Sequence, residues 1–300
     1  MNVDDAPVSH DEDEFRFLPQ DAERLGVSTI PPVERVGFTE EGEYLSALRW
    51  GSDPAPRLVL LHGGALNAHS WDRTLLALGR GAVAIDLPGH GDSAWREDRS
   101  YSAPFIAGSI ARALRYWATP PYTVIGHSMG SLGSLAALPE IGHDISKLVL
   151  VDISPGRKPR EQNPILEFIR GPESYESREE IFERAQSLGF GNRDSQATWQ
   201  NIALNTRRRA DGRYVFKHHI AHEPPSPAPT DVTYLWEPLE AFEGDIMLVY
   251  GSRGVLAEED IAEFARRLPS ARLEQLPAGH NVQRDAPVEL ANLLADFDPS

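Results

Sequence analysis

Short apolar runs alternate along the chain with segments in which apolar residues recur every three or four positions. The runs are rich in β-prone residues and predict strands, whereas the periodic segments predict helices. The predicted strands occupy residues 33–38, 44–50, 57–61, 82–85, 122–125, 147–153, 245–250 and 271–276, and the predicted helices residues 71–78, 106–117, 132–138, 258–268 and 288–297. This alternation indicates an α/β fold with a mostly parallel eight-stranded sheet that helices cover on both faces.

The alternation stops at residues 154–231, between the sixth and seventh predicted strands. Two helical patches, a tryptophan-bearing segment and a proline-dense stretch follow one another there, at 165–170, 179–188, around Trp199 and at 222–229. A structureless loop of this length would be improbable inside a compact domain. We therefore expect a helical lid at 154–231, inserted after the sixth strand of a core that comprises residues 31–153 and 232–300.

Residues 1–30 are acidic and polar and end before Pro31 and Pro32. They predict a partly disordered tail with one short helix near residues 19–25. Residues 1–14 lack the apolar stretch of a signal peptide, and no run of about 18 apolar residues occurs in the chain. We therefore expect a cytoplasmic protein without stable membrane insertion.

The charge balance limits the partners that the protein can have. The 300 residues include 45 acidic and 29 basic side chains, which give a formal charge of −16. Such a surface repels nucleic acid and anionic membranes, so we expect neither as a partner. The chain has no cysteine, which excludes disulfides, thiolate metal sites and a cysteine nucleophile. With 41% hydrophobic residues it can bury one large core, as a monomer or in a small homo-oligomer.

One motif carries a candidate nucleophile. The strand predicted at 122–125 runs into Gly126-His127-Ser128-Met129-Gly130, and a predicted helix follows. A G-x-S-x-G sequence between a strand and a helix is the pattern of a nucleophile elbow. The two glycines remove Cβ atoms that would clash in so sharp a turn. We expect Ser128 to present its hydroxyl at the carboxyl end of the sheet, where open α/β sheets bind ligands.

A serine nucleophile needs a base, and His280 is placed to serve. It follows the last predicted strand in Leu276-Pro277-Ala278-Gly279-His280, so it should lie at the same edge of the sheet as Ser128. The chain order, serine first and histidine near the end, is that of hydrolases with this elbow. We therefore predict that His280 is the general base.

Acyl transfer also needs donors for a developing oxyanion. The backbone N–H of Met129 lies at the start of the helix after Ser128, where the helix dipole favours negative charge. The turn His62-Gly63-Gly64 follows the strand at 57–61, and its glycines let the backbone approach a substrate. We expect Gly64 to supply the second N–H, with His62 and Gly63 beside the substrate.

The remaining histidines fit structural roles better than chemical ones. We expect His62 and His127 to order local backbone. His218, His219 and His222 lack acidic companions at ligand spacing, so we expect a solvated face of the lid and no metal site.

The lid should line the substrate pocket, because it is inserted at the edge of the sheet that carries the site. Its large aromatic side chains are the expected substrate contacts, namely Phe168, Phe182 and Trp199.

With these motifs, the chain from residue 33 to its end resembles the serine hydrolases of the α/β-hydrolase family. The segment Asp86 to Ser93 resembles the family's D-x-P-G-H-G-x-S turn, in which Asp86 and Asp92 serve loop geometry. In detail, residues 65–71 and 94–98 are similar to small actinobacterial carboxylesterases of the mycobacterial type. The resemblance implies an α/β-hydrolase fold and a small-molecule ester substrate, with no metal or organic cofactor.

The chain departs from the family at the acid of the triad. Most members carry G-x-x-D after the strand that ends here at Tyr250, but this chain reads Gly251-Ser252-Arg253-Gly254. Some relatives place the acid after the preceding strand, where this chain has Asp152. Neighbouring strands are about 4.8 Å apart, so Asp152 could reach an imidazole on the last strand's loop. Three acids further along remain as alternatives: Glu258, Glu259 and Asp260.

These residues predict a carboxylic ester hydrolase with an acyl-enzyme intermediate. Ser128 is the expected nucleophile, His280 the base and Asp152 the acid. A thioesterase or a C–C bond hydrolase would use the same triad. A non-catalytic, ligand-binding hydrolase fold is the alternative outside enzymes, because the usual acid is missing.

Overall fold

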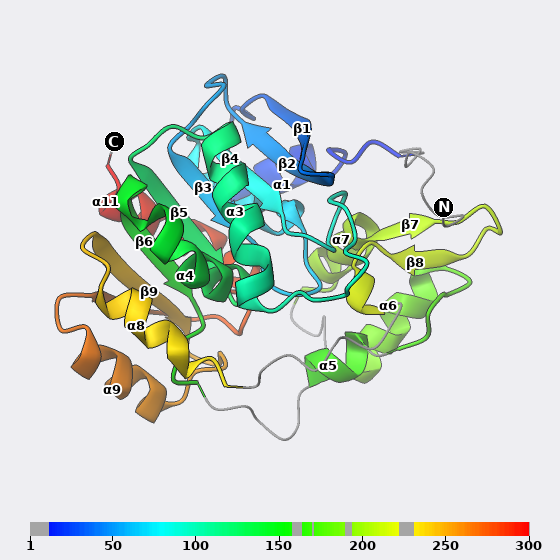
Figure 1. Ribbon diagram of the computed structural model, residues 1–300. Coiled ribbons are helices and arrows are strands. Elements are labelled where there is room, and N and C mark those ends of the chain that lie inside the picture. The colour runs from blue at the N-terminus through cyan, green and yellow to red at the C-terminus, as the bar shows by residue number, and fades with distance from the viewer. Residues whose placement is uncertain (1–11, 158–163, 170, 190–193, 222–230, 300) are drawn as a thin grey trace.

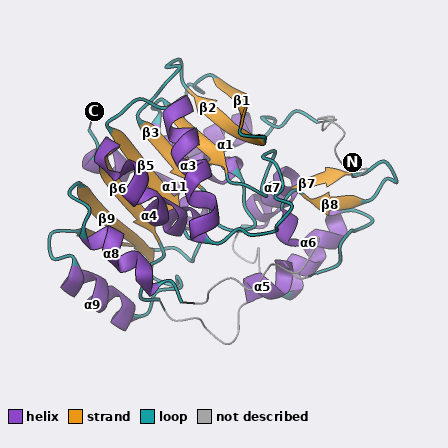
Figure 2. Cartoon of the chain, viewed as in Figure 1, coloured by secondary structure: helices purple, strands orange, loops and turns teal. Residues whose placement is uncertain are grey.

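An eight-stranded sheet forms the centre of the computed structural model, which describes residues 12–157, 164–169, 171–189, 194–221 and 231–299 (Figure 1). Its strands lie in the order β1-β2-β4-β3-β5-β6-β9-β10 (Figure 2). Strand β2 pairs antiparallel with β1 and β4, and every other neighbouring pair is parallel. The strands are β1 (Val33–Glu40), β2 (Glu43–Trp50), β3 (Leu58–Leu61), β4 (Ala82–Asp86), β5 (Tyr122–His127), β6 (Ile145–Val151), β9 (Asp245–Gly251) and β10 (Arg272–Leu276). The predicted mostly parallel sheet is thereby confirmed.

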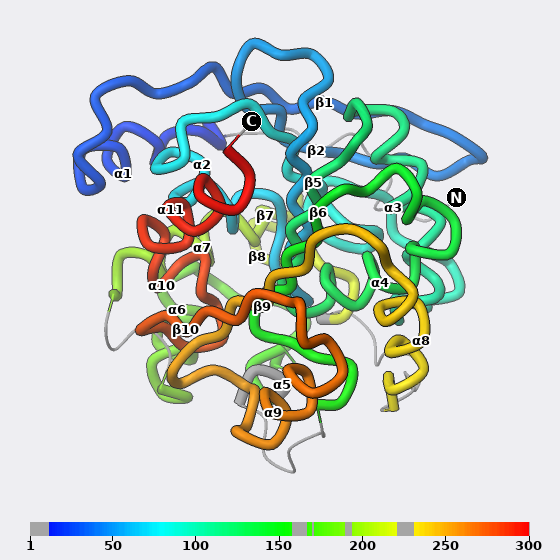
Figure 3. Tube along the Cα trace, turned by 90° about the vertical axis from the view of Figure 1, so that its left-hand side faces the viewer, coloured from blue at the N-terminus to red at the C-terminus, as the bar shows by residue number. Residues whose placement is uncertain are grey.

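Helices cover both faces of the sheet (Figure 3). One face is covered by α3 (Ala103–Trp117), α4 (Met129–Ile141), α8 (Trp236–Glu240) and α9 (Glu258–Arg267), and the other by α1 (Leu18–Leu25), α2 (Asp72–Leu78), α10 (Val282–Asp285) and α11 (Pro287–Phe297). Successive residues of β3 alternate between the two cores: Val59 packs with the first group of helices and Leu60 with the second. Because both faces are buried, the strands read as continuous apolar runs rather than as alternating ones.

Short helical segments complete the core and escape detection by spacing. Helices α8 and α10 are only five and four residues long, too short to display a helical period. The 3-10 turns are η1 (Ala68–Trp71), η2 (Gly142–Asp144), η3 (His219–Ala221) and η4 (Thr233–Leu235).

Between β6 and β9 the chain leaves the sheet and forms a separate small core beside it (Figure 1). This insertion contains α5 (Pro164–Ile169), α6 (Arg178–Ser187), α7 (Ser195–Asn205) and a hairpin of β7 (Thr206–Arg208) and β8 (Tyr214–Phe216). The sequence predicts α5 and α6 as helical patches, but for α7 it gives only a tryptophan-bearing segment. It does not predict the hairpin, whose three-residue strands are too short to show a period of two. The predicted proline-dense stretch 222–229, with His222, lies outside the described residues.

The N-terminal segment differs from the tail that composition predicts. The short helix is present as α1, and it buries Leu18 and Ala22 against the core. Before the helix, Glu14 forms an ion pair with Arg35 of β1 at 2.6 Å. Residues 12–30, as far as the structure describes them, are therefore attached to the fold, because an amphipathic helix with two buried apolar residues contributes to the core.

Polar contacts also join this segment to the insertion. Asp21 of α1 and Gln200 of α7 both bind the guanidinium of Arg73, which belongs to α2. Arg24 binds Asp194 at the start of α7 at 3.1 Å. The N-terminal segment thus contacts the core and the insertion together.

The ring of His69 lies between two carboxylates at this junction. Its Nδ1 is 2.8 Å from Asp72 and its Nε2 is 3.1 Å from Glu14, and its side chain is only 2% exposed. Burial by itself would lower the pKa of His69, but Asp72 and Glu14 outweigh burial and raise the pKa to about 9. Burial also raises the pKa of Asp72. We adopt the imidazolium as the folded state, because both ring nitrogens face carboxylate oxygens and both can donate only when the ring is protonated.

This arrangement predicts a pH dependence of stability. The folded-state pKa of His69 lies above the unfolded value of 6.5, so protonation stabilises the folded chain. The contribution is fully present below pH 6.5, is lost as pH rises through about 9, and amounts to about 3 kcal/mol at 1.36 kcal/mol per pKa unit. Urea unfolding of wild type and His69→Gln should show a difference in unfolding free energy that shrinks by this amount between pH 6.5 and about 9.5. A difference that stays constant over this range would contradict the ion-paired histidine.

Within the part of the chain that the structure describes, no helix combines the length and apolar character that crossing a membrane requires.

Candidate active site

Ser128 lies in a strained turn between β5 and α4. Its backbone has φ 50° and ψ −111°, a conformation that L residues rarely adopt. A Cβ on Gly126 would lie 2.5 Å from Cα of Ser131, and one on Gly130 would lie 2.5 Å from the carbonyl oxygen of Leu61. Both glycines are therefore required for the chain to turn here. Ser128 is half-buried, whereas the residues of β5 before it are buried.

Asp152 follows β6 and contacts the ring of His280. Its Oδ2 accepts a hydrogen bond from Nδ1 of His280 at 2.7 Å. The same carboxylate accepts the backbone N–H groups of Gly251 at 3.0 Å and Val255 at 2.9 Å. Asp152 is fully buried, whereas the His280 side chain keeps 17% of its surface exposed. A carboxylate that accepts from Nδ1 leaves the proton on that nitrogen, so Nε2 is free to act as a base.

The glycine at the usual acid position has a steric reason. A Cβ on Gly254 would lie 2.0 Å from Oδ1 of Asp152. The carboxylate of Asp152 therefore occupies the space that a side chain at position 254 would need.

The alternative acids lie elsewhere. Glu258, Glu259 and Asp260 form the first turn of α9, where acidic residues favour the helix dipole. Asp260 accepts the backbone N–H of Ala257 at 2.8 Å, and Glu258 and Glu259 are exposed. Of the four acids considered, Asp152 is the one hydrogen-bonded to His280.

Within the described residues, the Oγ of Ser128 makes no hydrogen bond. Contacts between a catalytic serine and histidine are often long in the absence of substrate and tighten in the complex.

The two predicted oxyanion donors lie close together. Met129 is the first residue of α4, so its N–H has no partner within the helix. A Cβ on Gly64 would lie 3.9 Å from the sulfur of Met129, which places the turn after β3 beside the start of the helix. Neither N–H has a hydrogen-bond partner among the described residues, so both remain available to a ligand.

His62 serves the backbone of this turn. Its Nδ1 donates to the carbonyl oxygen of Gly63 at 2.7 Å, and its Nε2 accepts the N–H of Leu87 at 2.9 Å. Burial lowers the pKa of His62, although the charge of Asp86 opposes this. The fully buried ring has no free nitrogen for a substrate, and only backbone of the turn can approach one.

The segment from Asp86 to Ser93 is also structural. Asp86 accepts the N–H groups of Ala68 and Asp92 and forms an ion pair with Arg35 at 2.7 Å. A Cβ on Gly91 would lie 2.3 Å from this carboxylate. The expectation that Asp86 serves loop geometry agrees with these contacts.

The expectation of a solvated histidine face in the insertion is wrong. His218 is 2% exposed, and its ring stacks on Phe216. Nδ1 of His219 forms a hydrogen bond of 2.7 Å with the hydroxyl of Tyr101, and the ring of His219 stacks on Trp95. These rings attach the insertion to the loop after β4, a long-range contact that the local sequence does not reveal.

The predicted aromatic substrate contacts pack within the insertion. The Phe168 ring meets Phe216 edge to face, and Phe182 meets Trp199 in the same way. All three predicted residues, Phe168, Phe182 and Trp199, are half-buried.

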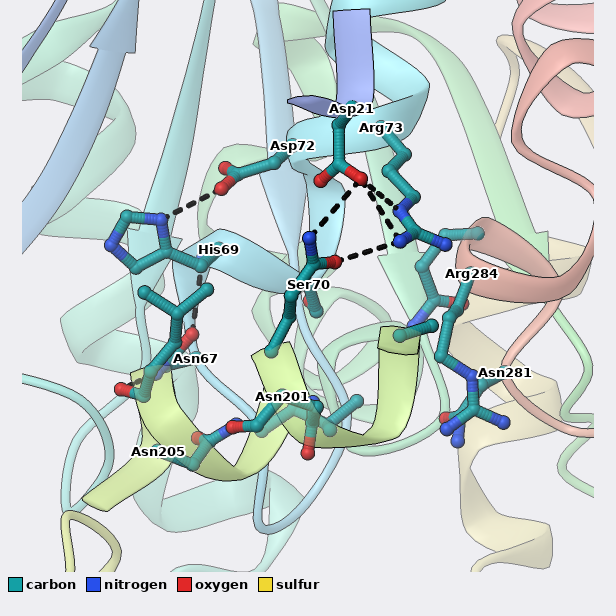
Figure 4. A pocket seen from close by; sticks show the side chains of 15 residues that line it. Asp21, Asn67, His69, Ser70, Asp72, Arg73, Asn201, Asn205, Asn281 and Arg284 are labelled. Carbon is teal, nitrogen blue, oxygen red and sulfur yellow. Dashed lines mark hydrogen bonds and ion pairs between the residues drawn. The ribbon is translucent and has the colours of Figure 1, made fainter. Parts of the chain in front are cut away.

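A cavity of about 50 Å³ lies between α10, η1, α1, α2 and α7, and most of the residues around it are polar (Figure 4). Asn281, Gln283 and Arg284 line it from the start of α10, and Asn201 and Asn205 from α7. Asp21 and Arg73 point toward one another at its far end. Its volume suits one or two water molecules rather than a substrate.

Comparisons with known proteins agree with this geometry. A model of the alpha/beta hydrolase family matches residues 58–293. Esterase Rv0045c of Mycobacterium tuberculosis is 34% identical over 292 residues, which cover 94% of each chain. A solved structure of that esterase superposes with a TM-score of 0.83 at 31% identity, covering 97% of this chain and 100% of its own.

A second solved structure, the thioesterase domain from the curacin biosynthetic pathway, has a TM-score of 0.72. It is 23% identical and covers 88% of this chain and 99% of its own, so it supports the fold alone. The elbow at Ser128, the eight-stranded sheet and the matched family model agree with one another. This chain belongs to the alpha/beta hydrolase family.

Proposed function

We propose that this protein is a serine carboxylic ester hydrolase that acts on a small-molecule ester through an acyl-enzyme. The observation that carries the proposal is the hydrogen bond of 2.7 Å between Asp152 and Nδ1 of His280, formed at the edge of the sheet that carries Ser128. The 34% identity to a mycobacterial esterase over 94% of the chain supports an ester, rather than a thioester or a C–C bond, as the substrate.

In the first half-reaction, Nε2 of His280 takes the proton of Ser128 as Oγ attacks the ester carbonyl. Asp152 keeps Nδ1 protonated and stabilises the imidazolium that forms. The N–H groups of Gly64 and Met129 bind the oxyanion of the tetrahedral intermediate. His280 then protonates the leaving alcohol, and the acyl group remains on Ser128.

In the second half-reaction, a water molecule replaces the alcohol. His280 takes a proton from this water as its oxygen attacks the acyl carbon, and the same N–H groups bind the second oxyanion. The proton returns to Oγ of Ser128 when the acid leaves. The cycle needs no group beyond the side chains and backbone named here.

The insertion at 154–231 is the proposed lid and selectivity element. It follows Asp152 directly in the chain, and its elements lie beside the carboxyl edge of the sheet (Figure 1). Movement of such an element frequently limits turnover in hydrolases with lids.

Ser128→Ala tests the nucleophile. The variant should fold, because the backbone strain lies in the turn and not in the hydroxyl. It should lose nearly all hydrolysis of acyl esters, with a residual rate of up to ~10³ over water from binding and the oxyanion donors. We would measure initial rates on a panel of acyl esters together with labelling by a fluorophosphonate. Full activity in this variant would refute the proposal.

Asp152→Asn tests the acid. Three donors converge on the Asp152 carboxylate, and an asparagine offers them only one acceptor oxygen. The imidazole would then favour the wrong tautomer, and kcat should fall by up to ~10⁴-fold, about 5 kcal/mol. Matched variants in α9, Glu258→Gln, Glu259→Gln and Asp260→Asn, should each keep kcat within a few-fold. An Asp152→Asn enzyme that melts early but turns over normally, beside an inactive α9 variant, would identify another acid.

Leucine substitutions at Phe168, Phe182 and Trp199 test the lid. If the insertion shapes the substrate pocket, these variants should change the preference among acyl chain lengths, seen in ratios of kcat/KM. Reactivity toward a small fluorophosphonate should change less, because that probe fills little of the pocket. An unchanged chain-length profile in all three variants would show that these rings support only the core of the insertion.

A further inference from the structure

The ring of His127 contacts three parts of the proposed catalytic centre at once. It precedes Ser128 in the chain, and its Nε2 lies 2.9 Å from the backbone carbonyl oxygen of His280. On its other side, a Cβ on Gly63 would lie 2.5 Å from Nδ1 of the ring. His127 therefore lies between the base loop and the turn that carries the oxyanion donor, and its side chain is fully buried.

The hydrogen-bond partners of the His127 ring show which of its nitrogens carries the proton. A backbone carbonyl only accepts, so Nε2 of His127 carries the proton and donates to His280. Nδ1 is then an acceptor, and the amide nitrogen of Gln283 donates to it at 3.3 Å. Gln283 is itself buried, and its backbone carbonyl oxygen accepts from the hydroxyl of Thr74 at 3.1 Å. A chain of hydrogen bonds thus runs from α2 through Gln283 and His127 to the backbone of His280.

The loop that carries His280 needs such support. The loop lies between β10 and α10, and no strand or helix fixes the backbone of His280. The N–H of Gly279 donates to the carboxylate of Asp285 at 2.9 Å, and the backbone carbonyl oxygen of His280 accepts from His127. Asp152 contacts the imidazole of His280 only at Nδ1. If the backbone of His280 moves, the ring can therefore rotate about this single hydrogen bond. A displacement of 1 Å in a catalytic group can lower the rate by about 10²-fold.

The charge state of His127 suits this role. Burial and the nearby His280 lower the pKa of His127 well below its usual value. The ring centroids of the two histidines are 4.7 Å apart. A neutral His127 keeps its donor on Nε2 at working pH, and it adds no second positive charge beside the imidazolium that forms on His280.

Resting on the proposed function, we propose that His127 is a positioning residue, which holds the backbone of His280 at a set distance from Ser128 through its Nε2–H donor. Loss of the donor should displace the base without altering the substrate pocket. The effect belongs to kcat rather than to KM, because the ring of His127 is buried and its Nε2 holds the backbone of the base, so a substrate does not bind to it directly.

Three substitutions separate the donor from the ring. The amide nitrogen of glutamine reaches about the position of Nε2, whereas that of asparagine reaches only about Nδ1. His127→Gln should therefore keep kcat within about fivefold. His127→Asn and His127→Phe should lose about 10- to 100-fold in kcat with KM within about twofold. His143→Phe is the matched control, because its side chain is 73% exposed, and it should behave as wild type.

We would measure kcat and KM on one acyl ester, the rate of fluorophosphonate labelling, and thermal melting for all variants, with Ser128→Ala beside them. If His127→Phe does not fold, the comparison of kcat between His127→Gln and His127→Asn still tests whether the donor at the Nε2 position matters. Equal activity of these two variants would overturn the inference, as would a loss expressed in KM alone. Activity in Ser128→Ala would instead refute the proposed function, so the two failures are distinguishable.

Discussion

The hydrogen bond between the buried carboxylate of Asp152 and His280 is the interaction on which the rest of this structure depends. The carboxylate also accepts N–H groups from Gly251, at the end of β9, and from Val255. One side chain thus joins the carboxyl ends of β6 and β9 to the loop after β10, which are consecutive in the sheet. A buried carboxylate without such donors would be strongly unfavourable, so the site and the local fold stabilise each other.

Close approach between backbone segments shapes the region around Ser128. Gly126, Gly130 and Gly63 each lie where a Cβ would collide with a neighbouring atom. Their absence of side chains lets the turn after β3, the start of α4 and the ring of His127 pack together. As a result, the N–H groups of Gly64 and Met129, which have no partner among the described residues, share one small region with the strained Ser128. This arrangement suits the oxyanion site of the proposed function.

The insertion is attached in a different manner from the helices of the core. Its links to the core and to α1 are largely polar, through Arg73, Arg24 and the rings of His218 and His219. Ion pairs at partly exposed positions contribute about 0–1 kcal/mol each. The apolar contacts of the insertion are instead made mostly within its own small core. Such an attachment suits the proposed role of the insertion as a lid that moves relative to the sheet.

The sequence by itself determined the order of the eight sheet strands and of the longer helices, the insertion after β6, and the positions of Ser128 and His280, because apolar periodicity and a strand–turn–helix motif are local properties. It left four acids open for the triad, it predicted the short helix near residues 19–25 but not its packing on the core, and it wrongly expected the histidines of the insertion to be solvated. Only the tertiary structure decided that Asp152 contacts His280, that α1 is buried, and that His127 reaches the base loop. Each of these depends on which segments lie side by side. Strand order and long-range packing bring together residues that are far apart in the chain, and the local sequence around each of them does not indicate that they are in contact.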